Sequence, residues 1–133
     1  MVQDFDRSHK RNRKTALAFG DFGETLAAWV LRFKGYRIIA RRHRTPVGEI
    51  DIVARRGNTL VFVEVKARID TATAATAITR HQQARIIRAA EAFVQSRRDL
   101  AHLDIRFDAV LVTQGSQLGK WPIHIVDAWR PGD

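Results

Sequence analysis

Three of the ionisable residues in two neighbouring, largely apolar stretches of the chain could act together in a chemical site. Asp51 lies within the stretch 48–53, and Glu64 and Lys66 lie within the stretch 61–66. Buried carboxylates destabilise a protein unless they are paired or bound to a cation, and two carboxylates held close together favour a divalent metal. Mg²⁺ is usually held by one or two carboxylates with water and phosphate oxygens, and a neighbouring lysine can orient or deprotonate the attacking water. These three residues therefore carry the groups that phosphodiester hydrolysis needs.

A simpler arrangement of the same residues is also open. Glu64 and Lys66 would then form an ion pair on an exposed strand face, and Asp51 would be solvated. A Glu-x-Lys spacing alone does not separate the two arrangements, because it is common in strands. Two such stretches joined by a short turn are more specific, and they favour the metal site.

The stretches that carry these residues are expected to be strands. Their β-branched and apolar residues predict strands over 36–42, 49–55 and 60–68, with turns at 45–48 and 56–59. Side chains alternate across a strand, so Ile50 and Ile52 would share the face opposite Asp51. If the second and third strands pair as an antiparallel hairpin, Asp51 and Glu64 lie side by side and Lys66 follows one step along.

Helical patterns precede and follow this hairpin. Apolar spacing predicts two helices, one over 15–34 that ends before Gly35 and one that begins after Thr79 and runs to about 97. Glu24 lies on the apolar stripe of the first helix. If that helix covers the sheet face bearing Asp51 and Glu64, Glu24 adds a third acid, which would reach a metal through water. The alternative is an ordinary glutamate at the edge of the stripe.

Two more strands complete the expected fold. They lie at 104–113 and 122–126, and the segments 69–78 and 114–120 are expected to be loops. A helix between two strands permits a parallel crossover, so the order of elements predicts an α/β fold with a mixed sheet flanked by helices. One domain is expected over 15–133. Residues 1–14 are expected to form a flexible basic arm, which either touches phosphate or only adds charge to the terminus.

The overall composition narrows the function classes. The chain has 133 residues, 45% of them hydrophobic, no cysteine and a formal net charge of +9. A domain this basic is expected to meet a polyanion, usually nucleic acid. Without cysteine there is no disulfide, thiol nucleophile or cysteine-held metal, which fits a cytoplasmic protein. No signal peptide or membrane span is expected, because the N-terminus is polar and no apolar run is long enough.

Four short motifs follow one another along the chain. They are Phe19-Gly20-Asp21-Phe22-Gly23-Glu24, Gly48-Glu49-Ile50-Asp51, Val63-Glu64-Val65-Lys66-Ala67-Arg68 and Arg106-Phe107-Asp108. Together they resemble the YraN family of small bacterial endonuclease-like proteins, over about residues 15 to 127. That family is similar to the restriction-endonuclease-like PD-(D/E)xK nucleases and, within them, to archaeal Holliday-junction resolvases. The resemblance implies a restriction-endonuclease-like mixed β-sheet flanked by helices.

The resemblance also implies a role for each candidate site residue. Asp51 and Glu64 would hold Mg²⁺ or Mn²⁺, Lys66 would place the attacking water, and Glu24 would be an additional catalytic acid. The chain departs from the pattern at two positions: Ile50 stands where a proline often precedes the aspartate, and Gln82 stands where the family often has a lysine. Resolvase-like nucleases can carry a glutamine on this helix, so Gln82 remains a candidate DNA contact.

Basic residues surround these motifs in the sequence. The run from 32 to 44 holds six Lys and Arg residues and no acidic one. Candidate phosphate contacts are Arg41, Arg42, Arg44 and Arg68. A scattered solvated surface is the alternative. The tryptophans, at 29, 121 and 129, are expected to be packing residues rather than platforms for bases.

The sequence therefore favours a metal-dependent DNA endonuclease, with branched DNA among its candidate substrates. The first alternative is a non-catalytic nucleic-acid-binding module that retains the nuclease fold. A second alternative is a protein-interaction role in which the acidic residues are structural. Resolvase-like relatives act as dimers, because two strands are cut symmetrically, so a homodimer is one assembly that the resemblance allows.

Overall fold

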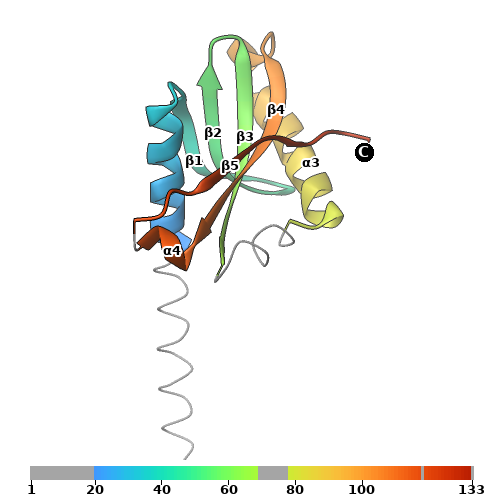
Figure 1. Ribbon diagram of the computed structural model, residues 1–133. Coiled ribbons are helices and arrows are strands. Elements are labelled where there is room, and N and C mark those ends of the chain that lie inside the picture. The colour runs from blue at the N-terminus through green and yellow to red at the C-terminus, as the bar shows by residue number, and fades with distance from the viewer. Residues whose placement is uncertain (1–19, 69–77, 118, 133) are drawn as a thin grey trace, which may run out of the picture.

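The computed structural model of the chain describes residues 20–68, 78–117 and 119–132. The expected basic arm over 1–14, the start of the first helix and most of the loop over 69–78 lie outside these ranges. A helix occupies 20–33, and the elements after it are β1 (Arg37–Thr45), β2 (Gly48–Arg56), β3 (Thr59–Arg68), α3 (Arg80–Ser96), η1 (Arg98–Leu100), β4 (Asp104–Thr113), α4 (Gln114–Gln117) and β5 (Ile123–Trp129) (Figure 1).

The five strands form one mixed sheet in the order β1-β2-β3-β4-β5. The first three strands pair as antiparallel hairpins, and β5 is antiparallel to β4. Strands β3 and β4 are parallel, because α3 carries the chain back across the sheet between them. The predicted α/β fold is confirmed, and its flanked mixed sheet is consistent with a restriction-endonuclease-like fold.

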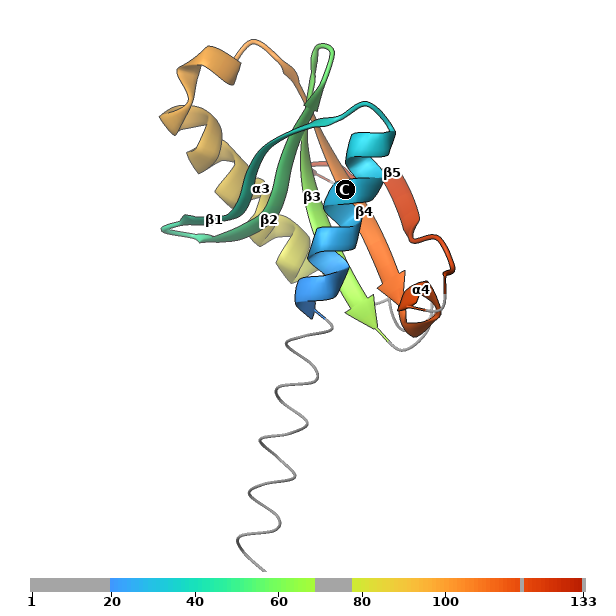
Figure 2. The same ribbon diagram turned by 90° about the vertical axis from the view of Figure 1, so that its left-hand side faces the viewer.

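The two helices cover opposite faces of the sheet (Figures 1 and 2). The helix at 20–33 packs Ala27, Ala28 and Leu31 onto one face, over Val61 and Val63 of β3. On the other face, α3 packs a second cluster, which includes Ile86, Ala90, Phe93, Leu60 and Phe62. Strand β3 is thus apolar on both faces along its first half, which makes the charged residues in its second half conspicuous.

The predicted start of the second helix and the predicted end of the first helix are confirmed. The Thr79 hydroxyl accepts a hydrogen bond from the backbone N–H of Gln82 at 3.2 Å, and the Gln82 side chain accepts one from the Thr79 N–H at 3.1 Å. These reciprocal bonds are a capping box, which satisfies two donors that the helix itself leaves unpaired. The first helix ends at Gly35, whose φ of +88° is readily adopted only by glycine.

Some boundaries differ from the sequence prediction. Strand β1 extends to Thr45, because Thr45 still pairs with Gly48 of β2 across the turn. Strand β5 extends to Trp129, which pairs with Phe107. The first part of the expected loop over 114–120 is instead the short helix α4. The two strands are longer than predicted because of pairing with a neighbouring strand, which the local pattern of residue types does not show.

One expectation about the tryptophans is wrong for two of the three. Trp129 is buried, with 4% of its surface exposed, but Trp29 and Trp121 are 52% and 61% exposed. The helix at 20–33 uses its small residues, Ala27 and Ala28, against the sheet, so Trp29 faces outward. In the described ranges, no helix is long and apolar enough to span a membrane.

Candidate active site

Glu64 and Lys66 lie on the face of β3 that α3 covers. The Lys66 Nζ atom is 3.3 Å from Glu64 Oε1, and the side chains are only 12% and 14% exposed, respectively. In the simpler arrangement this ion pair would lie on an exposed strand face. That expectation is wrong, because the pair is nearly buried. A nearly buried ion pair costs more solvation than a surface pair, so its presence here needs a reason other than solubility.

Asp51 reaches Glu64 through a break in the alternation of β2. Ile50 joins the apolar cluster under α3, whereas Ile52 joins the cluster under the first helix. The prediction that these two residues share a face is therefore wrong. Backbone pairing of β2 with β3 runs from Arg56 as far as Ile52, and next to this end Asp51 Oδ2 accepts a hydrogen bond from the backbone N–H of Val65 at 2.9 Å. A side chain thus joins the two strands beside Glu64.

Burial and mutual repulsion make both carboxyl groups reluctant to ionise. Burial raises the pKa of Glu64 to about 7, and the negative charge of Asp51 adds to the rise, against the opposing charge of Lys66. Burial also raises the pKa of Asp51, although the Val65 N–H partly opposes it. Near neutral pH the pair therefore readily holds a proton between its two carboxyl groups, in the place that a cation would take.

The donor set fits a magnesium or manganese ion. One oxygen of Asp51 accepts the Val65 N–H and one oxygen of Glu64 faces Lys66, which leaves one oxygen of each carboxylate for a cation. Within the described ranges, no group of three or more His, Cys, Asp or Glu side chains forms a metal cluster. Two carboxylates completed by water suit Mg²⁺, which keeps several of its waters, better than they suit Zn²⁺.

Glu24 lies beside Asp51 rather than beside Glu64. Its helix covers the sheet face opposite Glu64, so the expectation that this helix covers both acids is wrong. Glu24 is 8% exposed and accepts hydrogen bonds from Arg41 Nε at 3.3 Å and Arg42 Nε at 2.8 Å. Its negative charge contributes to the raised pKa of Asp51. Glu24 therefore influences Asp51 by its charge, from the sheet face opposite Glu64.

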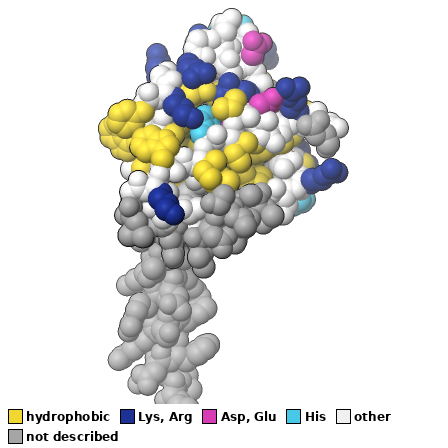
Figure 3. All heavy atoms as spheres, in the orientation of Figure 1, with side chains coloured by type: hydrophobic (Ala, Val, Ile, Leu, Met, Phe, Trp, Pro, Cys, Tyr) yellow, Lys and Arg dark blue, Asp and Glu magenta, His cyan; other side chains and the backbone are white. Residues whose placement is uncertain are grey.

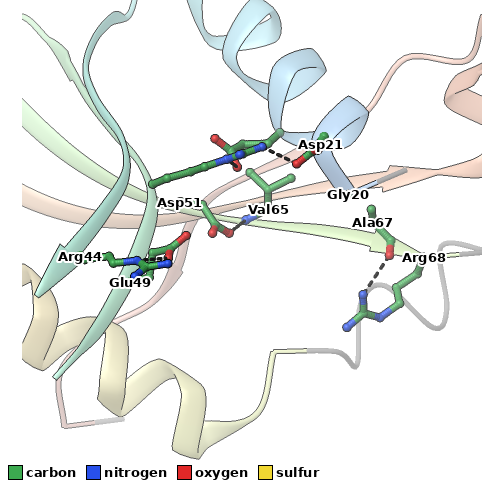
Figure 4. A pocket seen from close by; sticks show the side chains of 10 residues that line it. Gly20, Asp21, Arg44, Glu49, Asp51, Val65, Ala67 and Arg68 are labelled. Atoms are coloured by element: carbon green, nitrogen blue, oxygen red, sulfur yellow. Dashed lines mark hydrogen bonds and ion pairs between the residues drawn. The ribbon is translucent and has the colours of Figure 1, made fainter. Parts of the chain in front are cut away.

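Two cavities meet at Asp51. The larger, of 570 Å³, opens toward the first helix, and its charged lining comprises Asp21, Glu24, Arg42, Arg44, Glu49, Asp51 and Arg68 (Figure 4). The smaller, of 250 Å³, lies under α3 and is lined by Glu64, Gln82 and Arg85 as well as Asp51. Asp51 is thus accessible from both cavities, and Glu64 is accessible from the smaller one.

The predicted phosphate contacts divide into two kinds. Arg41 and Arg42 are engaged by Glu24, and Arg42 also pairs with Asp21. Arg44 is 89% exposed and only 3.5 Å from Glu49, and Arg68 donates to its neighbouring carbonyl at Ala67. Arg44 and Arg68 are therefore free to turn toward a phosphate, whereas Arg41 and Arg42 first hold Glu24 in place.

Arg85 is a site residue that the sequence reasoning missed. It lines the cavity of Glu64 and Gln82, and its side-chain carbons would lie 3.1 Å from a Cβ at Gly48. The available signal was its spacing of three residues from Gln82, which puts both on one face of α3. A glycine at 48 lets the Arg85 side chain of α3 come close to the turn between β1 and β2.

Comparison of the sequence with known proteins places the chain in a family. The model of the Uncharacterised protein family UPF0102 matches residues 23–112, which include all four candidate catalytic residues. The chain belongs to the UPF0102 family. It is 48% identical over 127 residues to the UPF0102 protein of Parvibaculum lavamentivorans, covering 93% of this chain and 92% of the relative. The UPF0102 protein of Maricaulis maris is 49% identical over 124 residues, 92% of this chain and 94% of that one.

A third relative is similar over a shorter stretch of the chain. The UPF0102 protein of Rhodopseudomonas palustris is 54% identical over 101 residues, which cover 76% of this chain and 79% of the relative. This alignment is shorter than those with the other two relatives, and its identity is higher.

Proposed function

We propose that this UPF0102 protein is a metal-dependent DNA endonuclease that hydrolyses phosphodiester bonds. The observation that carries the proposal is the Asp51–Glu64 pair, almost buried, joined to Lys66 and open to cavities with arginines in their walls. The consistency of the fold with restriction-endonuclease-like proteins supports it, as does the resemblance of the motifs to the YraN family and to PD-(D/E)xK nucleases.

Each residue has a task that its position suits. Mg²⁺ or Mn²⁺ would be held by Asp51 and Glu64 and would supply positive charge to the scissile phosphate and acidity to water. The Val65 N–H fixes the orientation of Asp51. Lys66 holds Glu64 and offers its ammonium protons to a water or a phosphate oxygen. Glu24, held by Arg41 and Arg42, sets the negative potential beside Asp51 without touching Lys66.

DNA would approach over the outer rim of these cavities. Arg44 and Arg68 stand on β1 and β3 at this rim, and the start of α3 brings Gln82 and Arg85 to the Glu64 side. Contacts from arginine to phosphate position a duplex but carry no sequence information. The proposed enzyme would therefore select DNA by shape, and branched DNA is the shape that the resolvase resemblance suggests.

Cleavage of a panel of labelled DNAs tests the proposal. Linear, nicked, single-stranded, flap and four-way-junction DNAs would be incubated with Mg²⁺ and with Mn²⁺, using wild type, Asp51→Asn and Glu64→Gln. An exposed ion pair far from the site, Arg97 with Asp99, supplies the matched control Asp99→Asn. We expect cutting by wild type and the control alone. Binding of DNA without cutting, equal in all four proteins, would favour the non-catalytic nucleic-acid-binding module instead.

A further inference from the structure

Three aromatic side chains are exposed together on a surface that the candidate active site does not use. Trp29, Phe33 and Trp121 are 52%, 75% and 61% exposed, and none of them lines either cavity at Asp51. Trp29 and Phe33 are one turn apart on the first helix, with ring centroids 6.4 Å apart, and Phe33 is 6.2 Å from Trp121. We call these three residues the aromatic patch.

The aromatic patch continues into an apolar strip along the edge strand. Ile123, Ile125 and Val126 of β5 are 42%, 38% and 51% exposed. Figure 3 shows hydrophobic side chains gathered on this face, with Lys and Arg side chains around them and few acidic ones. Large aromatic surfaces are costly to leave in water, so a cluster of three on a small domain marks a surface that binds a partner.

Positive charge surrounds the aromatic patch. The guanidinium of Arg32 lies over the Trp29 ring at 5.1 Å, and the guanidinium of Arg56 lies over Tyr36 at 4.5 Å. Lys34 is exposed, with its Nζ 2.8 Å from Nδ1 of His124 on β5, and Lys120 is exposed beside Trp121. Two guanidinium groups thus lie over aromatic rings, and the two lysines are next to Phe33 and Trp121 in the sequence.

The acidic residues that β4 and β5 bring near this surface do not neutralise it. Asp108 is wholly buried, at 0% exposure, and is bonded to Arg106 and His124. Asp127 is paired with Arg130. The potential over the aromatic patch is therefore positive, which favours a partner that carries both negative charge and flat apolar faces.

We propose that the aromatic patch binds single-stranded nucleic acid by stacking its bases on Trp29, Phe33 and Trp121. Single strands expose the faces of their bases, whereas a duplex hides them, and alternating aromatic and cationic groups suit bases and phosphates in turn. This surface stands apart from the proposed nuclease site and does not depend on it. For an enzyme acting on DNA, it would hold a displaced or unpaired strand.

A second copy of the chain is a poorer occupant. A symmetric dimer through this surface would bring the cations of both protomers, Arg32 and Lys34 among them, into one interface with few acidic groups to pair with them. Like charges facing across an interface oppose association. Charge complementarity therefore favours the polyanion.

Fluorescence anisotropy with labelled oligothymidylate, oligouridylate and a duplex hairpin tests the proposal. EDTA is present throughout, so that the result does not depend on a metal or on cleavage. We expect wild type to bind single strands, and Trp29→Ala/Trp121→Ala to bind them roughly five- to hundredfold more weakly, the range found for loss of base stacking. Trp29→Phe/Trp121→Phe keeps the rings and should keep most of the affinity. Tighter binding of oligothymidylate or of oligouridylate would show whether the bound single strand is DNA or RNA.

Two exposed apolar residues outside the aromatic patch supply the matched control. Val47 and Ile105 are 41% and 47% exposed, and Val47→Ala/Ile105→Ala should bind single strands as wild type does. Equal single-strand affinity in wild type and Trp29→Ala/Trp121→Ala would overturn the proposal. So would a wild-type dimer that becomes monomeric in that variant with unchanged oligonucleotide binding, because the surface would then serve self-association.

Discussion

At the residue scale, the candidate site is defined by an imbalance of charge. When both acids ionise, Asp51 and Glu64 bring two negative charges to one positive charge on Lys66, and all three side chains are largely buried. A proton corrects this imbalance in the metal-free protein, and a divalent cation would correct it in the loaded one. The same cost that makes the pair unfavourable alone makes it selective for a cation.

Removing one charge from this pair should stabilise the metal-free protein. Because the folded pKa of Glu64, about 7, lies above the ordinary 4.5, the folded state keeps a proton that the unfolded state loses, and stability falls as pH rises between these values. At about pH 8, Glu64→Gln should raise the free energy of unfolding by roughly 1–3 kcal/mol. Urea unfolding in EDTA measures this, with the exposed Glu91→Gln as control. A loss of stability in Glu64→Gln would contradict the assignment.

Away from the candidate site, a second group of charged residues lowers the pKa of a buried carboxyl group instead of raising it. Although burial alone would raise the pKa of Asp108, hydrogen bonds from His124, Arg106 and the Asp127 N–H outweigh it and lower the pKa to about 2. Arg106 also donates to the Tyr36 hydroxyl, so Asp108 and Arg106 together tie β4 and β5 to the segment between the first helix and β1.

Asp108 should govern acid stability. Its folded pKa, about 2, lies below the ordinary 3.8, so its contribution is present above about pH 4 and is lost as pH falls through 2. That contribution is about 2 kcal/mol. Asp108→Asn should lower stability at neutral pH by roughly 2–4 kcal/mol, since it leaves the partly buried Arg106 without its carboxylate partner. Thermal unfolding across this pH range measures both effects. An acid transition identical in wild type and Asp108→Asn would rule out this role.

At the scale of secondary structure, the sequence predicted the elements and the site strand well. Alternation along β3 correctly placed Glu64 and Lys66 on one face, and the cap at Thr79 marked the start of α3. The position of Asp51 was harder, because a break in β2 turns its neighbours to different faces and only the partner strand shows the break. Periodicity within one strand carries no information on such a tertiary irregularity.

The sequence could not predict which face of the sheet the first helix covers, or that Trp29 on this helix is exposed. Glu24 and Trp29 both lie on an amphipathic helix, and the helical pattern shows a stripe but not which sheet face it meets. Small residues, Ala27 and Ala28, make the contact with the sheet, which allows close approach and turns the large aromatic outward. A pattern based on hydrophobicity expects the largest apolar side chain inside.

The turn between β1 and β2 gives a test at the scale of elements. Gly48 has a φ of +152°, and a Cβ there would lie 3.1 Å from Arg85 carbons. Gly48→Ala should therefore cost on the order of 1–2 kcal/mol through backbone strain and displacement of Arg85. Thermal unfolding measures the loss, and Gly20→Ala, which meets nothing within 4 Å, is the matched control. Equal melting temperatures for wild type and Gly48→Ala would show that α3 does not press on this turn.

At the scale of the whole molecule, two separate surfaces among the described residues each carry a group of positive charges. Arg44 and Arg68 stand at the cavity rim, and Arg32, Lys34 and Lys120 surround the aromatic patch. Only the first group is expected to contact duplex phosphates near Asp51. Two separate cationic surfaces on one domain would suit a substrate that contains both duplex and unpaired strands.

The dependence of duplex binding on salt concentration should show whether DNA contacts Arg44 and Arg68 at the cavity rim. Arg44→Ala and Arg68→Ala should each reduce the slope of log affinity against log salt by about 1, because each removes one phosphate contact. Arg97→Ala, which breaks only the exposed pair with Asp99, should leave the slope unchanged. Titrations of a labelled duplex at several salt concentrations measure this. If Arg44→Ala and Arg68→Ala keep the wild-type slope, DNA does not cross this rim.

Calorimetric titration of Mn²⁺ into the protein near pH 7 tests the central claim most directly, because it needs no substrate. The account predicts one ion per chain, bound with release of protons, since Glu64 has a pKa of about 7 and must ionise to bind the metal. Asp51→Asn/Glu64→Gln should show no such binding, and Asp99→Asn should match wild type. Equal binding by wild type and Asp51→Asn/Glu64→Gln, or none by wild type, would contradict a metal site at this carboxylate pair.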